Sequence, residues 1–232
     1  MNENKIYDKP NLRLMAEGIL YRMRTGCPWR DLPSEFGLWN SIYKKFNRWS
    51  AKGKIKKIFK DLVKYPDLEW EFIDGSFVKA HQHSAGAASG QNEAIGKSKG
   101  GNTTKIHMAV DGFGLPIEFT LTGGEVHDCK AAPELLTKLP CSEFVIADKG
   151  YDSDFLRWLI HKKSSIPMIP RKNNSTVGNG DMDWCLYKYR HLVENVFARL
   201  KHFRAIATRY DKLKRNFEAM VAIGCAFLWL LL

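Results

Sequence analysis

The chain has 232 residues and a formal net charge of +11, with a pI near 9.4. This length allows one domain with its own core plus a small extra module, and the basic charge favours nucleic acid over a membrane surface as partner. The first residues contain no apolar signal stretch, and the apolar tail 219–232 is shorter than the ~20 residues that cross a membrane. We therefore expect a cytoplasmic, nucleoid-associated protein with no membrane role.

The cysteines argue against two further classes of protein. They are odd in number and form no close pair or Cys/His ligand spacing; they are Cys27, Cys129, Cys141, Cys185 and Cys225. Secreted disulfide frameworks and zinc sites both depend on such spacings. Reduced thiols in a cytosol are the expected state.

Three short helices are predicted near the N-terminus, over 11–24, 30–36 and 38–49, with Gly-containing turns between them. Short helices joined by tight turns are typical of helix-turn-helix modules. We therefore expect residues 1–64 to form a small all-α module and residues 65–232 a second, catalytic domain.

A basic run extends from Lys44 to Lys60, with eight Lys or Arg residues and no acid, interleaved with Trp and Phe. Such a run suits contacts with DNA phosphates, and Lys44, Lys45 and Arg48 are the candidates. The alternative is a solvated helical bundle that carries a basic face.

After residue 67 the spacing of the apolar residues changes from a helical pattern to that of a strand. Residues 69–78 are predicted to form a strand that is strongly apolar except for Asp74 at its middle. A carboxylate is costly to bury there without compensation, which a metal ion would provide. The stretch 81–101 is rich in Ala, Gly, Ser and Lys, so we expect a flexible loop in which His81 and His83 are polar loop residues rather than ligands.

A second carboxylate follows an apolar strand. The remaining predicted elements are a hairpin of strands 103–110 and 115–122, helices over 127–139 and 153–162, and strands over 144–147 and 166–169. The run 144–147 is wholly apolar, as expected for a strand covered on both faces. Asp148 comes directly after it, at the end of the strand where open α/β sheets bind their ligands.

A third carboxylate lies on a predicted helix over 187–201. Its apolar residues form one stripe, namely Val193, Val196, Phe197, Leu200 and the following Phe203. Tyr187, Arg190, Glu194 and Lys201 gather on the opposite side, because each residue of a helix turns by about 100°. Taken alone, this face could equally be solvated and hold ordinary charge pairs.

The order of elements predicts a mixed α/β sheet that brings Asp74, Asp148 and Glu194 together. An oxygen-only, anionic site of this kind suits Mg²⁺ or Mn²⁺. With two ions about 4 Å apart, one activates water or a 3′-hydroxyl and the other stabilises the leaving oxygen.

Six segments also resemble a known family. They are Arg24–Pro33, Ile73–Ser76, Gly101–His107, Gly123–Asp128, Ala147–Asp152 and the spaced set Tyr187, Arg190, Glu194 and Lys201. In these segments, which span nearly the whole chain, the protein resembles the DDE transposases of bacterial insertion sequences, specifically the IS-five family.

The resemblance implies an RNase H-like fold with Asp74, Asp148 and Glu194 as the metal-binding catalytic residues. Arg190 and Lys201 would contact the transposon end or the scissile phosphate, and Tyr187 would support that face. Such enzymes nick the ends of their element and join the 3′-hydroxyl to target DNA without a covalent intermediate. The implied partners are double-stranded DNA, as terminal inverted repeats and target, and a second copy of the chain in a homodimer.

Two other functions stay open. Relatives usually carry a further segment ahead of the helix that begins near Asn11, so the chain could be a truncated or repurposed copy that binds transposon ends without cutting them. It could also be an RNase H-like nuclease without joining activity.

Overall fold

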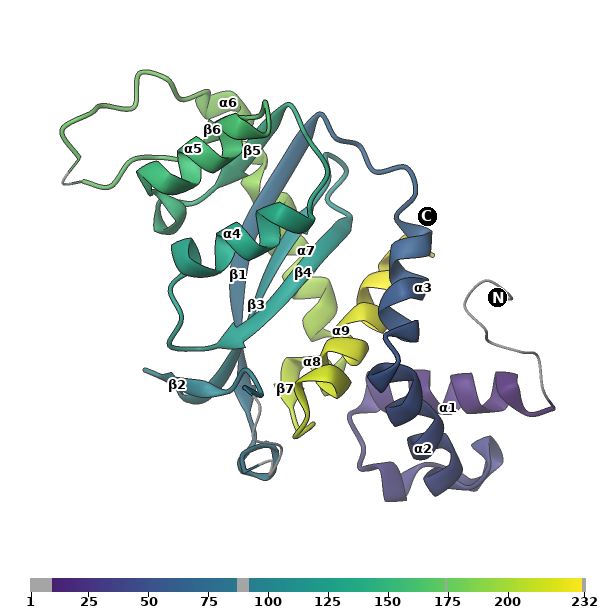
Figure 1. Cartoon of the computed structure of the whole chain (residues 1–232). Helices are drawn as coiled ribbons and strands as arrows, with labels where there is room; N and C mark the ends of the chain where they lie inside the picture. Colours follow the sequence, from purple (N-terminus) through teal and green to yellow (C-terminus); the bar gives the residue numbers. More distant parts are fainter. Residues whose placement is uncertain (1–9, 87–91, 174, 231–232) are drawn as a thin grey trace. The chain divides into compact units, whose positions relative to one another are not determined.

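A computed structural model of the chain describes residues 10–86, 92–173 and 175–230 (Figure 1). Its strands are β1 (Trp70–Ala80), β2 (Gly96–Ser98), β3 (Gly101–Val110), β4 (Pro116–Gly123), β5 (Phe144–Ala147), β6 (Ile166–Met168) and β7 (Thr208–Arg209). Its α-helices are α1 (Leu12–Thr25), α2 (Trp39–Ala51), α3 (Lys54–Leu62), α4 (Asp128–Lys138), α5 (Asp154–Lys162), α6 (Trp184–Tyr187), α7 (His191–Lys201), α8 (Arg204–Ala207) and α9 (Lys214–Trp229).

The chain folds into two compact units. The first contains the described residues of Met1–Lys64, Lys79–Glu93 and Arg199–Leu232, and the second those of Tyr65–Val78 and Ala94–Ala198. The chain first passes between the units after Lys64, and two later segments also belong to the first unit. The apolar helix α9 explains this, because it packs against α2 and α3.

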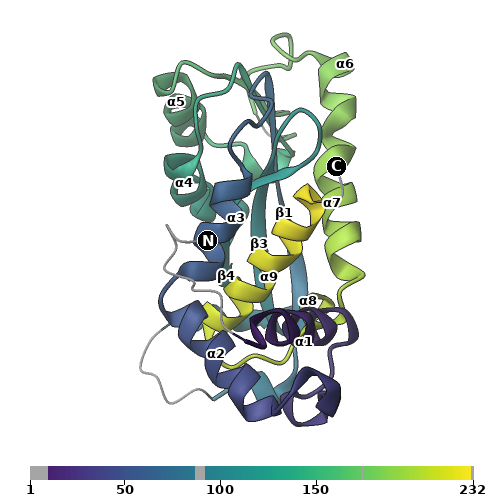
Figure 2. The same ribbon diagram turned by 90° about the vertical axis from the view of Figure 1, so that its right-hand side faces the viewer.

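The second unit is a mixed sheet flanked by helices, as predicted. The strand order is β2-β3-β1-β5-β6, with β4 paired to β3. Strands β1, β5 and β6 run parallel to one another, and β2, β3 and β4 form antiparallel pairs. Helices α4 and α5 cover one face of the sheet and α7 the other (Figures 1 and 2).

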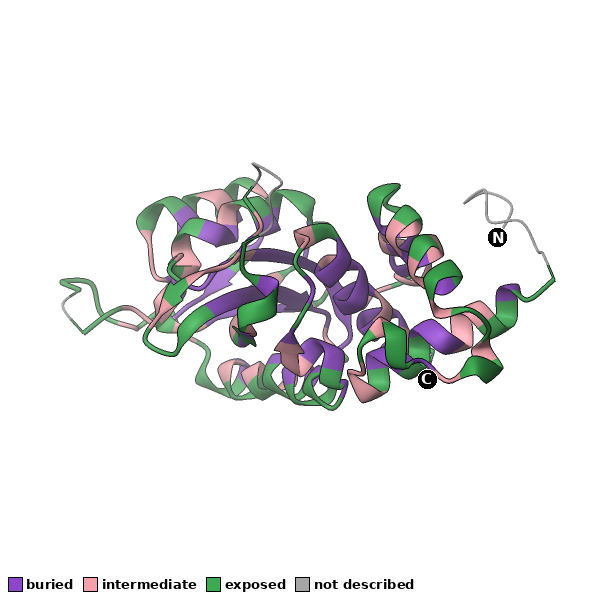
Figure 3. Cartoon of the chain, turned by 90° about the horizontal axis from the view of Figure 1, so that it is seen from below, coloured by how far each residue is buried: buried purple, intermediate pink, exposed green. Residues whose placement is uncertain are grey.

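The core of the second unit lies where the apolar patterns place it. Strand β5 has the bounds predicted from its apolar run. Most strand residues of the sheet are buried (Figure 3). The predicted stripe of α7 is at most 6% exposed at Val193, Val196, Phe197 and Leu200. One face of α7 is therefore fixed by packing, and its charged residues lie on the opposite face.

The helix predicted over 30–36 is absent from the structure. Two 3₁₀ turns, Trp29–Asp31 and Ser34–Phe36, take its place. Each follows a proline, and Pro33 between them both lacks a backbone N–H and disfavours helical geometry in the residue before it. The first unit instead contains α3, which the sequence analysis missed, and Gly53 joins it to α2 with a positive φ of 64°.

The stretch 81–101, for which we expected a flexible loop, contains two short elements among its described residues. A 3₁₀ turn spans Gln82–Ser84, and β2 pairs with β3 within the predicted loop. Ala94 is buried, and its carbonyl accepts a 2.6 Å hydrogen bond from Thr104 Oγ1. Residues 87–91 of this prediction lie outside the described residues.

Residues 219–229 of the C-terminal apolar run lie in α9 and are mostly buried, as expected for a core helix. Among the residues that the structure describes, no helix has both the length and the apolar character that a bilayer crossing requires.

Candidate active site

Asp74 and Asp148 occupy equivalent positions on neighbouring parallel strands. The register pairs Ile73 of β1 with Ala147 of β5, and each aspartate is the next residue. Neighbouring strands lie about 4.8 Å apart, so the two side chains begin from adjacent points on the sheet. The predicted pairing of these acids is therefore a direct consequence of the strand register.

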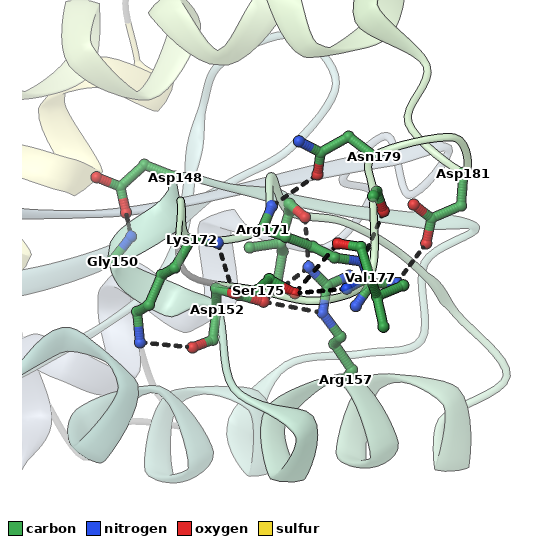
Figure 4. A network of polar contacts seen from close by, with 12 residues as sticks. Asp148, Gly150, Asp152, Arg157, Arg171, Lys172, Ser175, Val177, Asn179 and Asp181 are labelled. Atoms are coloured by element: carbon green, nitrogen blue, oxygen red, sulfur yellow. Dashed lines mark hydrogen bonds and ion pairs between the residues drawn. The ribbon is translucent and has the colours of Figure 1, made fainter.

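One oxygen of each aspartate is held by a backbone amide. Asp74 Oδ1 accepts from Gly75 N at 2.7 Å, and Asp148 Oδ1 accepts from Gly150 N at 2.8 Å. The second oxygen of Asp148 points away from this contact (Figure 4). These hydrogen bonds hold both carboxylates in place, and the second oxygen of Asp148 points away from the Gly150 amide.

Arg190 connects Asp74 to Glu194. Its Nη1 lies 3.2 Å from Asp74 Oδ2, and its Nη2 forms an ion pair with Glu194 Oε1 one helical turn away. The side chains of Asp74 and Arg190 are 19% and 23% exposed, whereas that of Glu194 is 50% exposed. The cluster is thus mostly buried where Asp74 leaves the sheet, and it is exposed to solvent where Glu194 leaves α7.

In this cluster the negative charges of the carboxylates outweigh the positive charge of Arg190. Burial raises the pKa of Asp74, and the charges of Asp148 and Glu194 raise it further, against the Gly75 hydrogen bond and Arg190. Burial alone would lower the pKa of Arg190, but Asp74 and Glu194 raise it above its ordinary value. The Arg190 guanidinium therefore compensates two carboxylates, those of Asp74 and Glu194.

Tyr187 belongs to the same neighbourhood, although the predicted continuous helix does not hold. Burial raises the pKa of Tyr187, and Asp148 and Asp74 raise it further, against the charge of Arg190. The α-helix begins only at His191, because residues 184–187 form the separate helix α6, capped by Asp183, and 188–190 form a 3₁₀ turn. The angular spacing inferred for a regular helix thus does not apply between Tyr187 and Glu194.

The other predicted DNA contacts lie in the first unit. Lys201 is the last residue of α7, and Lys44, Lys45 and Arg48 are on α2. Lys45 Nζ lies 5.2 Å from the centre of the Trp49 ring. One residue of the basic run, Lys56, is paired at 2.8 Å with Glu218 of α9, so not every charge in the run faces solvent unpaired.

No three His, Cys, Asp or Glu side chains among the described residues are close enough together to hold a metal ion. In this arrangement Arg190 is bound to the oxygens of Asp74 and Glu194 that a cation would also use. The donor atoms themselves, carboxylate oxygens on a negatively charged cluster, are the type that hard divalent ions prefer.

A second polar cluster, which we call the Asp128 cluster, contacts the residue after Asp74. Lys105 Nζ lies 2.6 Å from Asp128 Oδ2, and His107 Nδ1 lies 3.4 Å from Asp128 Oδ1. A Cβ on Gly75 would be 2.6 Å from Asp128 Oδ1. Only glycine therefore fits between the Asp128 cluster and the strand that carries Asp74.

The Asp128 cluster is mostly buried, although the Asp128 side chain is 23% exposed. His107 is fully buried, and its Nε2 lies 2.8 Å from Thr122 Oγ1. The Tyr151 hydroxyl lies 3.5 Å from Asp128 Oδ1, and burial, with the charges of Asp128 and Asp74, raises the pKa of Tyr151 well above its usual value. The sequence analysis did not predict this cluster, although the resemblance had marked both of the segments that supply Lys105, His107 and Asp128.

The chain after Asp148 is held by a further network (Figure 4). Asp152 Oδ1 accepts from Arg157 Nη2 at 2.9 Å, and its Oδ2 accepts from Lys172 N at 2.8 Å. Arg171 N donates to Asn179 Oδ1 at 2.8 Å. The loop between β6 and α6 is thereby fastened to the segment that follows Asp148.

Comparison with known proteins then identifies the family. The family model described as "Transposase DDE domain" matches residues 72–229, which include all three acids. The chain belongs to the DDE transposases. A second model, described as "Putative transposase of IS4/5 family", matches residues 3–59, and together the two assign this DDE transposase to bacterial insertion sequences.

Two curated relatives agree. The putative transposase for insertion sequence element IS6501 of Brucella ovis is 39% identical over 128 residues, which are 55% of this chain and 98% of that protein. The putative transposase for IS402 of Burkholderia cepacia is 29% identical over 136 residues, 54% of this chain and 62% of that protein.

The fold agrees with a solved transposase structure. A piggyBac transposase in a synaptic complex with hairpin DNA superposes with a TM-score of 0.57 at 10% identity, over 96% of this chain and 65% of that one. At this identity the match shows the fold alone. The DDE transposase thus has the predicted RNase H-like fold.

Proposed function

We propose that this DDE transposase nicks the ends of an insertion sequence and joins the exposed 3′-hydroxyl to target DNA. The observation that carries the proposal is the register of Ile73 with Ala147, which sets Asp74 and Asp148 side by side. Glu194 joins them through Arg190. In this proposal the three acids are the catalytic residues.

Asp74, Asp148 and Glu194 would hold the two Mg²⁺ or Mn²⁺ ions. The donor set fits, because burial raises the pKa of Asp74 and the like charges of Asp148 and Glu194 raise it further, and divalent cations would offset this negative charge. When bound, the ions supply activation of the attacking hydroxyl and stabilisation of the leaving oxygen. Arg190 and the metal ions would bind the same carboxylate oxygens, so metal binding would compete with the ion pairs of Arg190.

Arg190, Tyr187 and Lys201 are proposed to contact the DNA. Arg190 provides the fork of N–H donors that matches a phosphate, and it lies between two of the acids. Lys44, Lys45 and Arg48 of α2 would add sequence-independent affinity for the backbone of double-stranded DNA. The partners would be the terminal inverted repeats and target DNA, handled by a homodimer because two ends must be joined together.

The test is cleavage and joining of a labelled duplex that carries the element's own end, with Mg²⁺, Mn²⁺ or EDTA. We expect a nick and an end-to-target product with either metal and neither product with EDTA. Binding without a metal-dependent product would favour the alternative, a non-catalytic binder of transposon ends. Nicking without joining would instead favour a nuclease.

A further inference from the structure

The second unit contains a cavity of about 500 Å³ that adjoins the Asp128 cluster. Its walls come from β1, from the hairpin of β2 and β3, and from the segment between β4 and α4 (Figure 1). Lys105 of the Asp128 cluster lines it, whereas Asp74, Asp148 and Glu194 do not. The volume lies within the range of ligand sites.

Two glycines let the Glu125 side chain lie against the sheet beside the cavity. Gly96 of β2 pairs with Thr103 of β3, and Gly123 of β4 pairs with Thr104. A Cβ on either glycine would overlap the Glu125 carboxylate. No side chain other than that of glycine therefore fits at these two positions, and this part of the wall is closely packed.

Two lysines on the β2–β3 hairpin supply unpaired positive charge. Lys97 lies in β2 and Lys99 in the turn that follows, and both line the cavity. Both are exposed, and neither side chain forms an ion pair or hydrogen bond with another residue that the structure describes. Ser98 Oγ accepts from Gly100 N at 3.2 Å, which holds the turn. Both ammonium groups are therefore available to a ligand.

The other charges on the wall leave this excess of positive charge in place. Lys105 Nζ is already bound to Asp128 at 2.6 Å, so it adds little net charge. Glu125 is the one acidic residue among the described residues that line the cavity, and it offsets only one of the two unpaired lysines. An anion with a single negative charge matches this balance, and lysine binds phosphate groups as a point charge.

Phe77 places the cavity close to the acidic cluster along one strand. Asp74 and Phe77 are three residues apart in β1, so their Cα atoms are about 10 Å apart and their side chains point to opposite faces of the sheet. A DNA strand covers this distance with about three nucleotides, at about 3.4 Å each along its axis. Phe77 lines the cavity and is 47% exposed, so its ring offers an apolar surface beside the lysines.

We propose that this cavity binds one phosphodiester group of the DNA backbone, about three nucleotides from the cleavage point. Lys97 and Lys99 contact the phosphate, and the deoxyribose lies against Phe77. The inference rests on the proposed function, since it assumes that the chain binds the ends of the element. It adds a DNA contact within the catalytic unit to those proposed on α2 and α7.

The test compares wild type with the double variant Lys97→Gln/Lys99→Gln in the full chain. Both residues are exposed, so glutamine removes their charge without disturbing the core. The matched control is Lys130→Gln/Lys162→Gln, which removes the same charge from two exposed lysines of the same unit that do not line the cavity. Binding of a labelled duplex that carries the element's own end is measured in EDTA at several salt concentrations.

We expect the cavity variant to bind the duplex about 10-fold more weakly, as for the loss of one charged hydrogen bond. The slope of log affinity against log salt concentration should fall by about 1, the change for one lost phosphate contact. The control should keep the wild-type slope and lose less than about threefold in affinity, because it removes only distant charge.

Neutral methylphosphonates placed at single positions of the duplex locate the contact. In wild type, one such replacement within about three nucleotides of the element's end should weaken binding about 10-fold. In the cavity variant the same replacement should change binding less than about twofold, because the lysines that contact this phosphate are gone.

Equal affinities and salt slopes for the cavity variant and the control would overturn the inference. So would a cavity variant that stays as sensitive as wild type to every neutral phosphate. Labelled polyglutamate tests an acidic peptide as the ligand, and its selective loss in the cavity variant, with duplex binding unchanged, would also overturn the inference. Because binding is measured without metal, a wild type that shows the expected coupling but yields no metal-dependent nick would support the inference and contradict the proposed function. A wild type that does not bind the duplex would contradict both.

Discussion

Two aspartates that adjoin Gly75 have opposite electrostatic surroundings. Asp74 shares one guanidinium with Glu194 and is repelled by Asp148, so burial and like charges raise its pKa. Burial would also raise the pKa of Asp128, but the neighbouring His107 and the hydrogen-bonded Lys105 lower it. Carboxylates that the fold leaves poorly compensated are typical of functional sites, whereas fully paired ones stabilise the fold.

The largest expected effect concerns the poorly compensated acids. Asp74→Asn, Asp148→Asn and Glu194→Gln should each reduce metal-dependent strand cleavage by more than about 100-fold. Each variant removes an oxygen that would bind the metal directly, and this loss should cost more than the loss of an outer-shell partner, which costs about 10- to 100-fold. Initial rates of duplex nicking measure this. Asp154→Asn, an exposed acid on the same unit, is the control and should cut normally. Unchanged rates in all three variants would remove the acids from the site.

Asp128→Asn should act on stability instead. Lys105 has a side chain only 7% exposed and would lose its partner, which costs about 3 kcal/mol for a buried pair. Because the pKa of Asp128 is lowered on folding, the stabilisation is present above the unfolded pKa and lost as pH falls through the folded one. Urea unfolding at neutral pH tests the expectation, and wild-type stability of the variant would show that the pair is not structural.

Glu71 of β1 extends the comparison to a third buried acid. Burial raises its pKa to about 7, against a hydrogen bond from Ser142. A raised folded pKa means stability is fully present below the unfolded pKa and is lost as pH rises toward 7. Glu71→Gln should therefore stabilise the protein by about 3 kcal/mol at pH 8 and hardly at all at pH 4. A constant difference between wild type and variant across this pH range would contradict the assignment.

The smallest effect should have the opposite sign from that of Asp128→Asn. Asp74→Asn removes a buried, repelled charge and should raise stability by about 1 kcal/mol at neutral pH, the usual sign when a functional group is neutralised. The gain should vanish below the unfolded pKa of about 3.9. If instead Asp74→Asn unfolds as readily as Asp128→Asn, the two clusters do not differ as described.

Much of the acidic site could be predicted because its geometry follows from local patterns. A wholly apolar run predicts β5 and its end, so the place of Asp148 is set by the sequence alone. The apolar stripe of α7 likewise orients Glu194 away from the core. Asp74 is conspicuous as an acid at the middle of a largely apolar strand. None of these inferences requires knowledge of a distant contact.

Two of the missed features, β2 and the burial of Lys105, depend on tertiary contacts. Strand β2 has only three residues and exists because it pairs with β3. A lysine within a strand is usually taken as exposed, and Lys105 is buried only because Asp128 of α4 and the Phe77 ring meet it. Helix α3 was hidden by its lysines, although Ile55 and Phe59 recur at helical spacing and are buried.

The most direct test of the acidic site is Mn²⁺ binding to the purified chain without DNA, measured by isothermal titration. The wild type and Asp154→Asn should bind with equal affinity, and Glu194→Gln should lose binding, because Glu194 would supply a ligand while Asp154 would not. Arg190→Gln should bind Mn²⁺ more tightly, since it frees the oxygens of Asp74 and Glu194. Equal binding by wild type and Glu194→Gln would contradict the account.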